Sequence, residues 1–235
     1  FDIINVSGGL ARKLEGNLLI GGSLSSTQRA PSQVELFAEG EHVAAGRSEY
    51  GDASLDTESS LSSEFYVRKA WDNNQLRIAV FQNDYDNFIY LRHEDGGIDV
   101  DGGGIVVGGE DCTGETCFAY KQADAELNGY EIDYQTKLAL GSRLWDASAS
   151  YSSVKGELDD GTFLPSIPAD TVGLSLATTF VALSVQLDVE HVLDQKDVPA
   201  EEGEDHSVQQ ATDGFTNVDI TASYQPPHYE GLTFT

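Results

Sequence analysis

Apolar and polar residues alternate with a period of two along much of the chain. In the clearest stretch, residues 181–189, one face carries only aliphatic side chains: Val181, Leu183, Val185, Leu187 and Val189. The residues between them are small or polar, which is the pattern of a β-strand lying between an apolar and a polar medium. Similar alternation recurs over residues 132–140, 172–180 and 218–224. Helical periodicity of comparable length is absent, so the chain is predicted to be all-β.

Short and long connections alternate between the predicted strands. Short turns are expected at residues 14–16, 72–74, 141–143, 179–180 and 226–228, and long polar connections at about 27–54, 92–118, 156–168 and 194–213. An up-and-down antiparallel sheet gathers short turns at one rim and long loops at the other. About ten strands of roughly 10–20 residues fit the sequence, which is longer than the usual globular strand. These features predict a transmembrane antiparallel up-and-down β-barrel.

The composition of the two faces supports the membrane interpretation. Polar positions are mostly Ser, Thr, Gln, Asp and Glu, as expected for a wet lumen, and apolar positions mix aliphatic with aromatic residues. Aromatic residues are typical of the girdles that flank the lipid-facing band of a barrel. A soluble β-sandwich that acts as a binding module also alternates, and it stays open as a different class of protein.

The charge of the chain excludes some partners. There are 13 Lys and Arg against 40 Asp and Glu, giving a formal net charge of −27. A nucleic acid needs a basic face, and the basic residues here occur singly or in pairs, so nucleic acid is not expected as a partner. An acidic rim of long loops would instead attract cations. The chain starts at Phe1 and contains no Met, so we expect it to be a segment of a longer protein.

Two cysteines, Cys112 and Cys117, lie close together in a stretch rich in Gly and Glu. This spacing closes a small loop, and we predict a disulfide in an oxidising compartment. The alternative is two free thiols.

No catalytic constellation is apparent in the sequence. There is no G-x-S-x-G motif and no recognisable Ser–His pair, so an enzyme is not expected. The Gly-rich run at 102–109 lacks the lysine of a phosphate-binding loop, and no cofactor is expected.

Several local motifs resemble those of the TonB-dependent outer-membrane receptors, and the resemblance runs nearly end to end. The similar segments are Arg29–Ser32 with Glu35–Leu36 and Gly40–His42, Gly51–Leu55 with Glu58, Tyr85–Tyr90, Gln122–Ala125 with Asn128–Glu131, Leu164–Pro168, and Asp194–Gln195 with Thr212–Thr216. The last two are most similar to the subgroup that includes zinc-uptake receptors. Ser166 and Ala169 depart from its pattern, in which Arg and Pro stand at these positions.

The resemblance implies that residues 1–235 form about the second half of a 22-stranded barrel in the bacterial outer membrane, in contact with its lipid and lipopolysaccharide. The plug domain and the final strands would then lie outside this chain. The implied function is energy-coupled uptake of a scarce nutrient, either a metal ion such as zinc or a metal chelate such as a siderophore. TonB, ExbB and ExbD would be partners through the plug. A passive porin, or a barrel for adhesion or translocation, is the alternative.

Receptors of this kind bind their ligand with the extracellular loops, so candidate ligand-binding residues are sought in the long connections. They are His42, His93, Glu94, Asp95, Asp205 and His206. Imidazole beside carboxylate is a ligand set that zinc prefers, and His42, His93 and His206 are the candidate metal ligands, with zinc as cargo and not as a cofactor. The alternative is that all are solvated loop residues in a very acidic protein.

Overall fold

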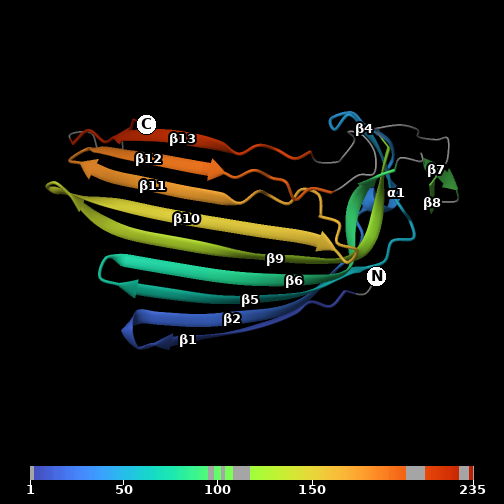
Figure 1. The fold of residues 1–235 in the computed structure, drawn as a ribbon, viewed down its shortest axis with the longest axis horizontal. Helices are drawn as coiled ribbons and strands as arrows, with labels where there is room; N and C mark the ends of the chain where they lie inside the picture. Colours follow the sequence, from blue (N-terminus) through green and yellow to red (C-terminus); the bar gives the residue numbers. More distant parts are fainter. Residues whose placement is uncertain are drawn as a thin grey trace.

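Nine long strands form one curved wall in the computed structural model, which describes residues 3–94, 98–101, 104–107, 117–199, 210–227 and 233–234 (Figure 1). Their order across the sheet follows the chain: β1 (Val6–Leu14), β2 (Leu18–Arg29), β5 (Glu58–Trp71), β6 (Asn74–His93), β9 (Cys117–Leu140), β10 (Arg143–Leu158), β11 (Thr171–Phe180), β12 (Leu183–Val192) and β13 (Phe215–Tyr224). All neighbouring pairs are antiparallel. This arrangement confirms the predicted up-and-down β-barrel wall.

The remaining elements are short and lie in the connections. They are the 3₁₀ turn η1 (Glu15–Asn17), α1 (Gln33–Phe37), β3 (Glu39–His42), β4 (Arg47–Tyr50), β7 (Ile98–Asp101) and β8 (Gly104–Val107). Helix α1 was not predicted, because five residues are too few to show a helical period. It begins with a capping box, in which the Ser32 hydroxyl accepts from the Glu35 N–H and the Glu35 carboxylate accepts from the Ser32 N–H.

The short turns lie together at one end of the wall and the long connections at the other, as predicted (Figure 1). The turn between β11 and β12 is displaced from its expected place. The alternation of the sequence predicts that Val181 belongs to a strand, but Val181 has φ 55° and is 92% exposed, and β12 begins at Leu183. A tight hairpin turn needs residues with positive φ, and this requirement outweighs the strand preference of valine here.

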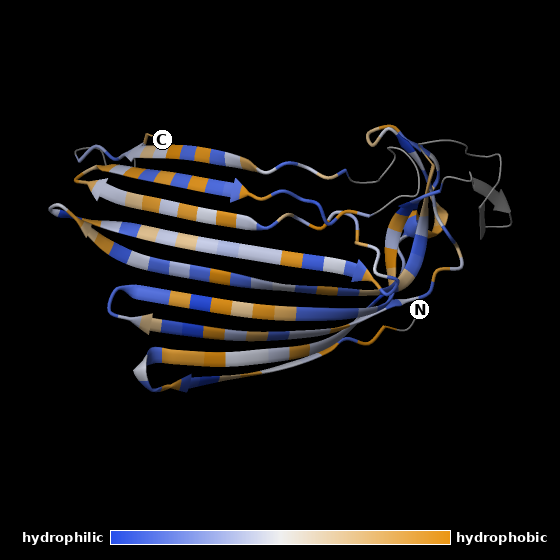
Figure 2. Ribbon diagram, viewed as in Figure 1, coloured by the Kyte–Doolittle hydropathy of each residue, from blue (hydrophilic) through white to orange (hydrophobic). Residues whose placement is uncertain are grey.

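One face of the wall is predominantly apolar. The cross-strand registers place one row of side chains on this face of six successive wall strands: Ile20, Val67, Ile78, Ile132, Tyr151 and Val172. Large apolar residues on this face are open to the surroundings, among them Leu174 at 53% and Ile220 at 74% exposure. Orange and blue bands along the strands show the alternation (Figure 2). A soluble sandwich would bury this face, so its exposure indicates contact with lipid.

The opposite face carries charged pairs, as a wet lumen allows. Arg77 lies near three carboxylates, with nitrogen–oxygen distances of 2.8 Å to Glu131, 3.4 Å to Asp133 and 3.8 Å to Glu64. Lys137 and Asp146 form a further pair at 2.7 Å. Within the described residues, no helix is long and apolar enough to cross a membrane.

The wall bends at the end that carries the long connections. In β6 the register against β9 shifts between Tyr85 and Phe88, and Asn87 has φ 56°. This β-bulge turns the part of the β6–β9 pair that lies nearest the long connections (Figure 1). An apolar group, here called the mouth cluster, packs at the bend. It consists of Ala125, Leu158 and Leu164 with the partly buried Tyr85, Phe88, Tyr90, Ala123, Leu127 and Ile167. Leu164 and Ile167 come from the connection after β10, which therefore folds back onto the wall.

Candidate functional site: the extracellular rim

The connection between β2 and β5 reaches across the sheet to β9. Strand β4 pairs with β3 and also, in parallel, with the upper end of β9, where Glu49 is opposite Phe118 and Tyr50 opposite Ala119. β10 pairs with β9 only as far as Ala125. The same edge of β9 between Cys117 and Ala125 is therefore available to β4. This pairing skips β5 and β6 and anchors the first long connection at the rim.

The buried Glu49 carboxylate is the centre of a polar group, called the Glu49 cluster. Glu49 is 6% exposed. Its Oε1 accepts from Arg47 Nε at 2.8 Å and lies 3.1 Å from His42 Nδ1, and its Oε2 accepts from the Tyr120 hydroxyl at 3.4 Å. The Arg47 guanidinium lies over the Phe118 ring, 5.0 Å from its centroid. A carboxylate at this depth needs such partners, because an unpaired buried charge is costly.

The partners decide the protonation of the Glu49 cluster. Burial alone would raise the pKa of the Glu49 carboxyl, but hydrogen bonds from His42 and Arg47 and the Arg47 charge outweigh it, and this pKa lies below its ordinary value. The pKa of Tyr120 is raised by burial and by the neighbouring Glu49. Glu49 is therefore ionised at neutral pH and Tyr120 is a neutral hydrogen-bond donor.

A second polar group, the Arg29 cluster, ties the base of the same connection to the wall. Arg29 at the end of β2 donates to Glu35 of α1 at 2.8 Å and to Glu58 of β5 at 2.9 Å. Glu58 also accepts from the main-chain N–H of Ile89 on β6. Burial would raise the pKa of the Glu35 carboxyl, yet the hydrogen bonds from Arg29 and Ser32 hold it below its ordinary value.

The structure brings part of the predicted metal-ligand set to one region. His42 contacts Glu49, which is opposite Phe118 in the β4–β9 pair, and the His93 ring lies 5.1 Å from the Phe118 ring. Glu94 forms an ion pair with Lys121 at 3.1 Å. Asp95, Asp205 and His206 lie outside the described residues. Among the residues that the structure describes, no three His, Cys, Asp or Glu side chains are placed to hold a metal, and the predicted set stays a prediction.

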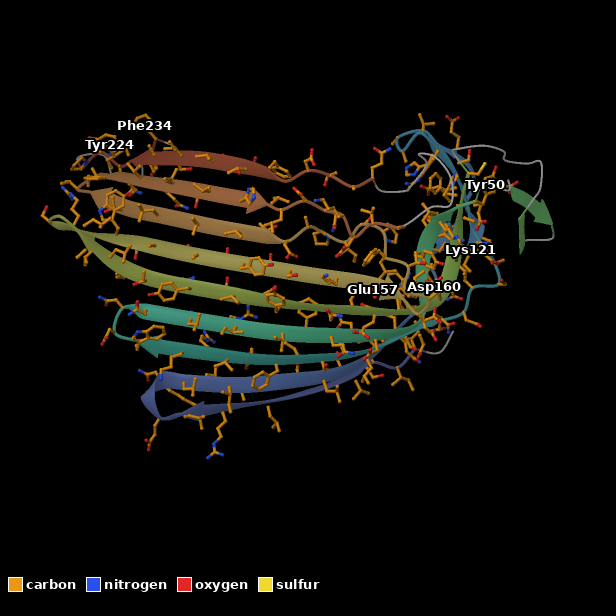
Figure 3. The ribbon with its side chains drawn as sticks, in the orientation of Figure 1. Tyr50, Lys121, Glu157, Asp160, Tyr224 and Phe234 are labelled. Carbon is orange, nitrogen blue, oxygen red and sulfur yellow. The ribbon has the colours of Figure 1, made fainter. Side chains whose placement is uncertain are left out.

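Side-chain placement at the two ends of the wall can be followed in Figure 3. Tyr50 and Lys121 lie at the bent end of β9, with Glu157 and Asp160 nearby, whereas Tyr224 and Phe234 lie at the end with the short turns. Cys117 is buried at the start of β9. Cys112 lies outside the described residues, so the predicted bridge between them also stays a prediction.

The residues that make most of the contacts at the rim were not predicted from the sequence. Arg47, Glu49, Tyr120 and Arg29 were not among the candidates. Local signals existed for two features: Arg47 and Glu49 share one face of a short alternating segment, and Ser32 with Glu35 fits the capping-box pattern. The contact with Tyr120 joins residues 71 positions apart, and no local pattern signals it.

The wall is long, antiparallel and up-and-down, with an apolar exposed face, a polar lumen face and long connections at one rim. Together these features define an outer-membrane β-barrel. The family model described as "TonB dependent receptor-like, beta-barrel" matches residues 7–235, and the chain belongs to this family. It is thus part of a bacterial outer-membrane barrel, and the soluble-sandwich alternative is excluded. The family comprises transport receptors and not enzymes, in line with the expectation from sequence.

Solved structures share this fold at low sequence identity. The copper transporter OprC superposes with a TM-score of 0.69 at 17% identity, over 94% of this chain and 31% of that one. The siderophore receptor PirA from Pseudomonas aeruginosa gives 0.63 at 17%, over 97% and 37%. A ferric enterobactin receptor (PfeA) from the same organism gives 0.69 at 17%, over 97% and 34%. The chain spans about a third of the length of each.

Proposed function

We propose that the protein containing this chain takes up a scarce metal nutrient across the outer membrane, with zinc as the first candidate and a metal chelate such as a siderophore as the second. Uptake would be driven by TonB, ExbB and ExbD through a plug domain. Family membership supports the energy coupling. The similarity to a copper transporter and to siderophore receptors supports a metal or a metal chelate as the cargo.

The uneven distribution of charge along the chain is the observation that supports a cation as the cargo. The four long connections, at residues 30–57, 94–116, 159–170 and 193–214, hold 23 of the 40 acidic residues but only two basic ones, Arg47 and Lys196. A rim of one sign raises the local concentration of ions of the opposite sign and speeds their capture. It also repels anionic chelates, so the free cation is favoured over an anionic siderophore complex.

The polar clusters at the rim would give the acidic loops a fixed base. The Glu49 and Arg29 clusters use their carboxylates internally, so they do not supply the attracting charge. That charge comes from exposed residues such as Glu39 and Glu41 on β3. His42 lies next to these residues, and β6 ends at the same rim with His93, just before Glu94. We propose that they bind the metal together with Asp95, Asp205 and His206.

Zinc binding by the purified intact protein tests the ligand set. Replacing His42, His93 and His206 together with Ala is expected to lower the calorimetric zinc affinity at least tenfold, since each lost imidazole removes one metal–nitrogen bond. His191→Ala is the matched control, because His191 lies on β12 and contacts Thr216. Unchanged affinity in the triple variant rejects these ligands.

Uptake of radioactive zinc by cells that express the protein tests the energy coupling. Uptake is expected to fall to background when the tonB gene is deleted. Uptake that persists without TonB would indicate the passive porin instead. If zinc is neither bound nor taken up while a ferric siderophore is, the second candidate replaces the first.

A further inference from the structure

The lipid-facing side of the wall is hollowed over β10. A groove of about 450 Å³ runs there between Tyr134 and Leu138 of β9 and Leu174 and Leu176 of β11, with Ala147 and Ala149 of β10 between them. The register sets Ala149 opposite both Tyr134 and Leu174, so a small side chain lies between two large ones. The volume falls in the range of small-molecule sites, about 300–1,000 Å³. We call it the β10 groove.

The end of the β10 groove nearest the short turns is bordered by aromatic residues and a cation. Trp145 is opposite Leu138 and forms an edge-to-face pair with Phe180, with ring centroids 6.2 Å apart. The Arg143 guanidinium lies over the Phe180 ring, 4.4 Å from its centroid, and donates to the Thr179 carbonyl at 3.4 Å. These contacts hold the exposed guanidinium at the end of the wall that carries the short turns. They leave most of its five N–H donors for another acceptor.

Arg143 and the groove are placed to contact one molecule. Arg143, Ala147 and Ala149 lie on the same face of β10, because side chains on a strand alternate. Arg143 and Ala147 are four residues apart, or roughly 13 Å along an extended strand. The short turns of outer-membrane barrels face the periplasm, so Arg143 lies at the level of the headgroups of the inner, phospholipid leaflet.

We propose that the β10 groove binds an acyl chain of one inner-leaflet phospholipid and that Arg143 binds its phosphate. The apolar lining matches an acyl chain, and a guanidinium pairs with a phosphate through parallel N–H donors. The stacking of Arg143 on Phe180 orders the cation before the lipid arrives, which lowers the cost of binding. The site is separate from the extracellular rim, and it requires only that the wall lies in the outer membrane.

The intact protein in detergent, titrated with phosphatidylglycerol and examined by native mass spectrometry, tests the site. We expect one phospholipid to be retained more tightly than the rest. Arg143→Gln is expected to weaken its retention about tenfold, through loss of a charge-assisted contact. Ala149→Leu fills the groove and is expected to weaken it similarly. Lys69→Gln is the matched control, because Lys69 is a basic residue on the same face and at the same rim, beside Leu18 and Leu76.

Folding of each variant is checked by the change in gel mobility on heating that marks an intact barrel. The proposal is overturned if folded Arg143→Gln and Ala149→Leu proteins retain the lipid as the wild type does. It is also overturned if Lys69→Gln loses as much lipid as Arg143→Gln, which would indicate a general lipid shell. Retention of lipopolysaccharide in place of phospholipid would likewise reject it.

Discussion

Arg29 and Glu58 face each other across the β2–β5 pair, and the two N–H···O contacts between them measure 2.9 and 3.2 Å. Each residue also bonds outside the pair: Arg29 donates to Glu35, and Glu58 accepts from the Ile89 N–H. One ion pair thus links β2, α1, β5 and β6. Arg29 is the last residue before the first long connection and Glu58 the first residue after it. The ion pair therefore holds the two ends of that connection together on the wall.

Replacing Glu58 with Ala is expected to loosen the first long connection without unfolding the wall. The change leaves Arg29 with one carboxylate and the Ile89 N–H without its acceptor, at a cost of about 1–3 kcal/mol for a buried unsatisfied group. Hydrogen exchange of residues 30–57 should accelerate while the wall amides of β5 and β9 stay protected. Asp146→Asn is the control, because the exposed pair of Lys137 and Asp146 should contribute less than about 1 kcal/mol. Equal exchange in wild type and the Glu58 variant would contradict this role.

The packing of residues 30–57 against the wall should weaken as the pH falls. The pKa values of the Glu35 and Glu49 carboxyls lie below their ordinary value in the folded protein, because the effect of burial is outweighed by hydrogen bonds that include those from their cationic partners. A depressed folded pKa gives stability that is complete above the unfolded value and is lost as the pH falls through the folded value. Hydrogen exchange of residues 30–57, referenced to an unstructured peptide at each pH, should be constant between about pH 7 and 5 and accelerate below about 4.5.

Glu49→Gln separates this effect from general acid unfolding. The variant keeps the shape of the side chain but has no carboxyl to titrate, so the acceleration below pH 4.5 should be smaller for residues 39–50. A loss of protection that is the same in the variant and the wild type would show that other carboxylates control the transition.

The wall was predictable because its determinants are local. Alternation over stretches such as 183–189 fixes both the strand and its lipid-facing side, since only one register exposes all the aliphatic residues to lipid. The turn between β11 and β12 was misplaced by about two residues because a turn is set by backbone conformation, and Val181 gives no sign of positive φ.

The rim was less predictable because its contacts are long-range. His42, His93 and Glu94 stand out in the sequence as polar residues in long connections, but nothing near them indicates which residues they contact. The parallel pairing of β4 with β9 uses an edge of β9 that is open because β10 ends opposite Ala125. Those features arise from the assembled sheet, and a single segment of sequence does not contain them.

A thiol count tests the disulfide predicted between Cys112 and Cys117. Under denaturing, non-reducing conditions we expect no titratable thiol in the intact protein if these are its only cysteines, and two after reduction. Such a bridge would hold the start of β9, where Cys117 is opposite Ser48 of β4. Replacing both cysteines with Ser should therefore accelerate hydrogen exchange in β4. Two titratable thiols without reduction would disprove the bridge.

Gly156→Val should displace the connection after β10 from the mouth cluster. A Cβ at Gly156 would lie 2.9 Å from Ile167 Cδ1 and 3.0 Å from Leu164 Cδ1, and Leu164 is only 1% exposed. Overpacking of this kind costs about 1–3 kcal/mol. The Leu164 N–H, which donates to the Gly156 carbonyl, should then exchange faster, as should its neighbours in residues 159–170. Gly8→Val is the matched control, because a Cβ at Gly8 meets nothing within 4 Å and the residue also lies in a wall strand. Unchanged protection of residues 159–170 in the Gly156 variant would show that this connection does not depend on the close approach of Leu164 and Ile167 to the wall.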